Sequence, residues 1–179
     1  MKQLVFIIFG FCTISNYAQN SGSVNATFNL SQVAMLDLEP NYSTVTLNLA
    51  ASAEAGEMTT IVMANNKKWI NFSSAVSSTA ASRSILIKID GGQVPPGVYL
   101  KLGTSNYVGI GKGVLGSPSG ILTLNSTPQT VISNIRGANT GDGINNGYEL
   151  TYYLEIYDYK LLDFNQSAAL SISLTLTDL

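Results

Sequence analysis

Side-chain oxygens that could bind a metal ion gather in the stretch TGDGINNG (140–147). Asp142, Asn145 and Asn146 supply these oxygens, and a calcium ion takes about six to eight of them. The stretch lacks the D-x-[DN]-x-[DN]-G spacing of an EF-hand because Ile144 stands in the third position. The sequence therefore predicts a candidate calcium site here, with an ordinary glycine-rich turn as the alternative interpretation.

Two tyrosines form a second candidate site, for carbohydrate. In GYELTYYLEIYD (147–158), apolar and polar residues alternate, so that Tyr153 and Tyr157 share the polar face of a predicted strand. Their rings could offer flat apolar surfaces with a polar tip to a sugar. The alternative interpretation is packing across neighbouring strands, with the hydroxyls in water.

Enzymatic chemistry has little support in this sequence. The chain has no histidine and one cysteine, Cys12, which excludes Ser-His-Asp triads, Cys-His pairs and zinc sites built on histidine or thiolate outside the N-terminal segment. Asp37 and Glu39 would lie about 6.6 Å apart on a strand, but nothing places them in a cleft. The glycines of GIGKGVLG (109–116) precede no helix, so no dinucleotide site is expected. We predict no catalytic residue, no enzyme activity and no cofactor apart from calcium.

The N-terminal segment has the layout of a secretory signal peptide. Lys2 precedes an apolar run (4–11), and a polar stretch then ends in the small residue Ala18. We therefore expect a signal over residues 1–19 and one β-sandwich domain over residues 20–179. Its location would be the periplasm, the outer cell surface or the medium, and its structure would contain no disulfide, because Cys12 falls within the signal.

Charge and hydropathy limit the partners. The chain has 9 basic and 11 acidic residues, without charge runs, so nucleic acid and anionic membranes are poor partners. No segment after the signal approaches the length of a membrane span. We expect three kinds of partner: other extracellular proteins, subunits of the same kind, or glycans.

Alternation with period two dominates the rest of the chain, which predicts an all-β fold of about ten short strands. A single immunoglobulin-like antiparallel sandwich is the expected architecture, with a jelly roll as the alternative. Lys67 and Lys68 suit a tight hairpin turn, and Pro96 and Gly97 suit a type II turn. After an opening strand, the predicted strands are Val33–Leu38, Ser43–Ala51, Thr59–Asn66, Trp69–Ser74, Arg83–Asp90, Gly97–Thr104, Gly120–Ser126, Thr130–Ile135, Gly147–Asp158 and Ala168–Leu179.

The opening strand is predicted at GSVNATFNL (22–30). Val24, Ala26, Phe28 and Leu30 lie on one side of it, and polar residues lie on the other. Such a strand could pair within its own sheet, or it could complete the sheet of a neighbouring subunit by strand exchange. The sequence leaves both arrangements open.

The stretches VPPG (94–97), TGDGINNG (140–147) and LTLTD (174–178) resemble those of small secreted β-sandwich proteins of Gram-negative bacteria that are pilin-like in layout. The resemblance covers most of the chain after the signal. It implies an exported sandwich and brings no catalytic residues. We therefore expect a non-enzymatic structural or adhesive surface protein, such as a fimbrial-type subunit, with an extracellular module that binds carbohydrate or calcium as the alternative.

Overall fold

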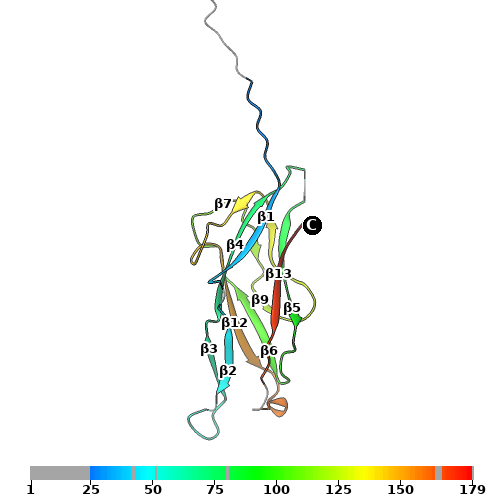
Figure 1. The fold of residues 1–179 in the computed structure, drawn as a ribbon. Coiled ribbons are helices and arrows are strands. Elements are labelled where there is room, and N and C mark those ends of the chain that lie inside the picture. The colour runs from blue at the N-terminus through cyan, green and yellow to red at the C-terminus, as the bar shows by residue number, and fades with distance from the viewer. Residues whose placement is uncertain (1–24, 42, 51, 80, 164–166, 179) are drawn as a thin grey trace, which may run out of the picture. The chain divides into compact units, whose positions relative to one another are not determined.

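A computed structural model describes residues 25–41, 43–50, 52–79, 81–163 and 167–178. Residues 31–179 form one compact unit, which is distinct from the unit of residues 1–30. The structure is 52% strand, with one 3-10 turn (Tyr159–Leu161) and no α-helix among the described residues. The predicted all-β sandwich is confirmed: antiparallel sheets pack against one another (Figure 1).

The larger sheet has β4 near its centre. β1 pairs with one edge of β4, while β12 and β11 pair with successive parts of the other edge. β6 and β9 follow β12, and β7 follows β11. The strands of this sheet are β1 (Val33–Glu39), β4 (Lys67–Ala75), β6 (Val98–Thr104), β7 (Lys112–Gly113), β9 (Ile121–Thr123), β11 (Ala138–Asn139) and β12 (Tyr148–Ile156).

The second sheet has the order β13-β5-β10-β8. Its strands are β5 (Arg83–Gly91), β8 (Ser117–Pro118), β10 (Gln129–Ile135) and β13 (Ser171–Asp178). A separate hairpin consists of β2 (Thr46–Ala50) and β3 (Thr60–Ala64), which pair only with each other among the described strands.

The core lies between the two large sheets and follows from the alternation. On β5, Ile85, Ile87 and Ile89 are buried, while the intervening Leu86 and Lys88 are half-exposed. The same period buries every second residue along most of β6 and β12, whereas β4 buries five consecutive residues, 68–72, and β10 buries the adjacent Val131 and Ile132. The core residues are Ile70, Phe72, Ile85, Ile87, Ile89, Leu100, Leu102, Leu124, Val131, Ile132, Ile135, Tyr148, Leu150 and Tyr152.

One predicted turn is wrong. Lys67 and Lys68 do not form a hairpin turn but begin β4, and the chain turns at Asn65, whose φ is 52°. The strands on either side of this turn do not pair with each other: β3 pairs with β2, whereas both edges of β4 are taken by β1 and by β11 and β12. By contrast, Gly97 has a φ of 85°, as the predicted turn after Pro96 requires.

The predicted opening strand does not pair within its own sheet over its described part. The described residues of this segment, 25–30, belong to no strand. Phe28 and Leu30 are 91% and 87% exposed. Alternation predicts which side of a strand is apolar, but a strand forms only where a partner edge is available.

Candidate interaction surface

Two edge strands, β1 and β13, lie close together without pairing. β1 pairs only with β4, and β13 pairs only with β5. An edge strand has one row of backbone N–H and C=O groups without a strand partner. The two sheets therefore meet here at two free edges.

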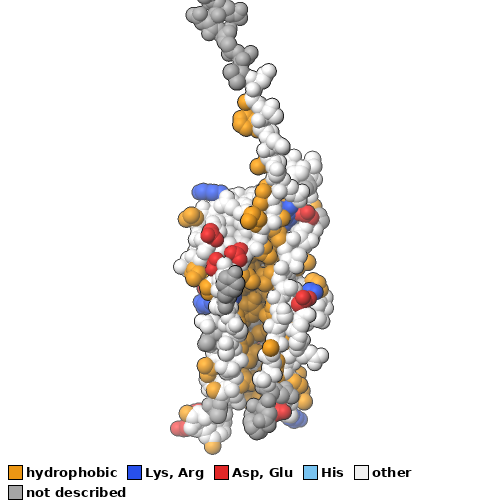
Figure 2. All heavy atoms as spheres, in the orientation of Figure 1, with side chains coloured by type: hydrophobic (Ala, Val, Ile, Leu, Met, Phe, Trp, Pro, Cys, Tyr) orange, Lys and Arg blue, Asp and Glu red, His pale blue; other side chains and the backbone are white. Residues whose placement is uncertain are grey.

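Apolar side chains between these edges are incompletely covered. They pack against the core but remain half-exposed, and Figure 2 shows them as a continuous stripe of hydrophobic side chains beside β13. We call this stripe and its two flanking edges the seam. Its residues are Leu36 and Leu38 of β1 and Leu170, Ile172, Leu174 and Leu176 at β13.

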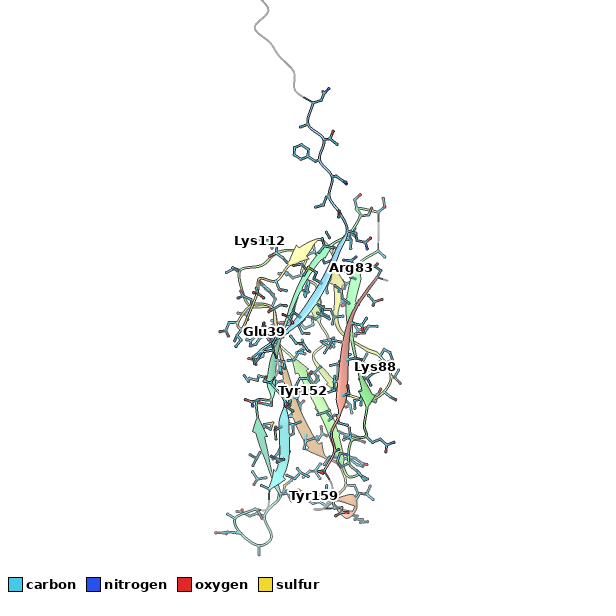
Figure 3. All side chains as sticks on the ribbon, viewed as in Figure 1. Glu39, Arg83, Lys88, Lys112, Tyr152 and Tyr159 are labelled. Carbon is cyan, nitrogen blue, oxygen red and sulfur yellow. The ribbon has the colours of Figure 1, made fainter. Side chains whose placement is uncertain are left out.

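One end of the seam is held by a buried cation. Arg83, which is 1% exposed, donates from Nε to Asp178 Oδ1 of β13 at 2.5 Å. Its Nη1 donates to the backbone carbonyl of Val33 at the start of β1 and to Ser74 Oγ of β4. Figure 3 shows Arg83 where the ends of β1 and β13 approach each other. A single guanidinium therefore links both edge strands.

A second buried cation holds the other end of β1. Lys68 is 8% exposed, and its Nζ donates to the carbonyl oxygens of Pro40 and Ser43 at 2.8 and 2.6 Å and also to Ser43 Oγ. Burial lowers the pKa of Lys68, and the nearby Glu39 carboxylate opposes this shift. The connection between β1 and β2 is thus attached to β4 through its backbone.

The β2–β3 hairpin continues the apolar surface beyond this attachment. In its register, Leu47 lies opposite Met63 and Leu49 opposite Ile61, so the four side chains share one face. Leu47 packs against the core, whereas Leu49 and Met63 remain exposed. The hairpin therefore extends the seam with a second apolar face that lacks full cover.

The strand-exchange residues lie outside this compact unit. Ala26, Phe28 and Leu30 are exposed and belong to no strand, while Val24 lies outside the described residues. The structure does not test whether they enter another sheet.

The three candidate calcium residues have different partners. Asp142 joins Asp37 and Glu39 in a cluster whose carboxylate oxygens lie within 4.8 Å of one another; we call it the acidic cluster. Asn146 is occupied elsewhere, since its Oδ1 accepts from the Ile110 N–H and its Nδ2 donates to the Asp142 carbonyl. Asn145 is an exposed residue with a φ of 65°.

An open pocket of about 380 Å³ adjoins Asp37 and Asp142 of the acidic cluster. Its wall also includes Met35, Asn71 and Phe72. Asn71 is buried and bonded to the turn: its Oδ1 accepts from the Gly143 N–H at 2.8 Å, and its Nδ2 donates to the Asn146 carbonyl. The turn is thereby fixed against β4, which explains why two acids from β1 meet one from a distant loop.

The candidate carbohydrate residues pack across strands. Tyr157 stacks on Tyr99 of β6, with ring centroids 4.3 Å apart and an interplanar angle of 21°. Beside this pair, Lys101 forms an ion pair with Glu155 at 3.1 Å. Tyr153 lies opposite Lys101 in the register and is half-exposed. One face of the Tyr157 ring is therefore covered by a neighbouring strand.

Sequence reasoning did not identify Arg83 and Lys68 as residues of this surface. Their positions along the strands could have indicated that they are buried. Each is a charged residue at an inward position of an alternating strand. Arg83 precedes the buried Ile85 by two residues, and Lys68 precedes the buried Ile70 by two. A charge in phase with a core row needs partners inside the protein.

The chain matches no protein-family model, no curated protein and no solved structure. In the part of the chain that the structure describes, no helix combines the length and the apolar character needed to cross a bilayer.

Proposed function

We propose that this chain is an exported, non-enzymatic structural or adhesive protein that joins other polypeptides by accepting a β-strand at the seam. The observation that carries the proposal is the uncovered apolar stripe between two free strand edges, β1 and β13. A strand laid along such an edge gains main-chain hydrogen bonds, and its alternate side chains enter the apolar surface.

An added β-strand is a more favourable partner for the seam than a loop or a helix. The row of Leu170, Ile172, Leu174 and Leu176 is only partly buried, and removing apolar area from water stabilises a complex by about 25 cal/mol per Å². A loop or helix would cover the side chains but leave the backbone groups of the edge without strand partners. An added strand satisfies both.

Cysteine labelling tests the proposal on cells that produce the protein. The chain has one cysteine, Cys12, within the predicted signal, so Leu174→Cys would place a single thiol in the seam and Thr175→Cys would place one on the outer face of β13. We expect the thiol of Leu174→Cys to react only after urea is added and that of Thr175→Cys to react in both conditions. Equal labelling of the two thiols on native cells would show that the seam is empty and would overturn the proposal.

A further inference from the structure

We infer that the strand accepted at the seam is residues 24–30 of a second copy of this chain. The inference rests on the proposed function and adds the identity of the partner. Phe28 and Leu30, exposed and without a strand partner in their own chain, are the apolar side chains that would be covered.

The arm, residues 24–30, matches the seam in length and period. Its four apolar residues, Val24, Ala26, Phe28 and Leu30, alternate over seven positions. The half-exposed row from Leu170 to Leu176 also has four apolar residues at alternate positions over seven. At about 3.3 Å per residue, both rows span about 20 Å. The apolar side chains of the arm can therefore lie along the whole row from Leu170 to Leu176.

Charge favours the same pairing. Residues 20–32 contain no charged side chain, and the part of β13 from Ser171 to Thr177 contains none either. Pairing of the arm with this part of β13 therefore buries no unpaired charge from either segment. The polar side of the arm, with Asn25, Thr27 and Asn29, would face solvent beside the serines and threonines of β13.

The arm of the same molecule is a poorer occupant than that of a second copy. Ser31 and Gln32 are the only residues between the arm and β1. Folding back beside β1 would require a two-residue hairpin turn, which needs positive φ and is typically made with glycine or asparagine. Moreover, Val33 is held at the start of β1 by Arg83. A separate copy supplies the arm without this turn.

The test compares two full mature chains that differ in which side of the arm carries a new charge. Phe28→Glu changes the apolar side, and Asn29→Glu is the matched control on the polar side. In light scattering over a concentration series, we expect the unmodified chain and Asn29→Glu to form oligomers and Phe28→Glu to remain monomeric. Equal behaviour of the two variants would contradict the inference.

A peptide experiment separates strand insertion from general stickiness. The Phe28→Glu chain keeps an intact seam, so it should capture a fluorescent peptide of residues 22–30. The same peptide with Phe28→Glu should bind at least about tenfold more weakly, because it loses the burial of one aromatic ring. The peptide with Asn29→Glu should bind within about twofold of the original.

Failure of this inference and failure of the proposed function give different results. If the mature chain stays monomeric and the Phe28→Glu chain does not capture the unmodified peptide, the arm is not the partner. If the thiol of Leu174→Cys is then protected on cells but reacts in the purified monomer, the seam is occupied on cells and the occupant is another protein. Free labelling of Leu174→Cys would overturn both.

Discussion

Replacing Asp178 by asparagine tests whether the buried Arg83 links the two edge strands. The substitution removes the carboxylate that accepts from Arg83 Nε at 2.5 Å and keeps nearly the same shape. The guanidinium stays buried and retains the Val33 carbonyl and Ser74 Oγ as acceptors.

The expected loss can be worked from the contact. A hydrogen bond to a charged group contributes about 1.5–3 kcal/mol. The Asp178 side chain is 64% exposed, so water already screens part of its charge. We therefore expect Asp178→Asn to lower the free energy of unfolding by about 1–2 kcal/mol, or Tm by about 2–8 °C for a chain of this size.

Urea denaturation of the chain without residues 1–19 measures this loss, with Asp90→Asn as the control. Asp90 also pairs with a cation, since Lys88 Nζ lies 2.6 Å from its Oδ1, but both side chains are about half-exposed, at 40% and 50%. We expect the control to change stability by less than about 0.5 kcal/mol. Equal effects of the two substitutions would refute the reasoning, because they would show that burial of Arg83 adds nothing to its ion pair.

Three further predictions concern titration, charge and backbone. Burial raises the pKa of Tyr152 to about 12, above its unfolded value of 10.0, so stability is full below pH 10 and falls as the pH rises toward 12; in urea titrations, Tyr152→Phe should flatten this alkaline loss. Asp142→Asn should stabilise the chain by up to about 1 kcal/mol in metal-free, low-salt buffer, because it relieves repulsion in the acidic cluster; an unchanged Tm would contradict this. Gly147→Ala should cost more than about 3 kcal/mol, since a Cβ would lie 2.0 Å from the Ile70 carbonyl oxygen, whereas Gly143→Ala, also at positive φ but in open space, should cost far less in thermal melts.

Alternation along the chain predicted most strands, because a strand with one buried face has apolar residues at every second position of its sequence. The predicted strand Arg83–Asp90 became β5, and the last two predicted strands became β12 and β13 with slightly narrower bounds. The strand predicted at residues 22–30 is absent from its described part, 25–30, because alternation shows which side of a segment is apolar but not which edge it pairs with.

Contacts between distant segments could not be predicted from local patterns. Two adjacent lysines are typical of a polar turn, yet Lys68 is buried because Pro40 and Ser43, 28 and 25 residues earlier, supply its acceptors. The acidic cluster likewise depends on the turn at Asp142 reaching β1. The sequence shows two acids in the segment that forms β1 and a turn at Asp142. Only the fold brings these two segments together.

The pairing of β4 has a consequence for the order in which the protein can fold as it emerges from the ribosome. β1 can pair with β4 early, but the other edge of β4 waits for β12; Lys67 and Glu149, which form an ion pair across this junction, are 82 residues apart. β5 likewise waits for β13, at the end of the chain. A partly emerged chain therefore exposes two unfinished apolar rows, and such long-range closure is slow and prone to aggregation.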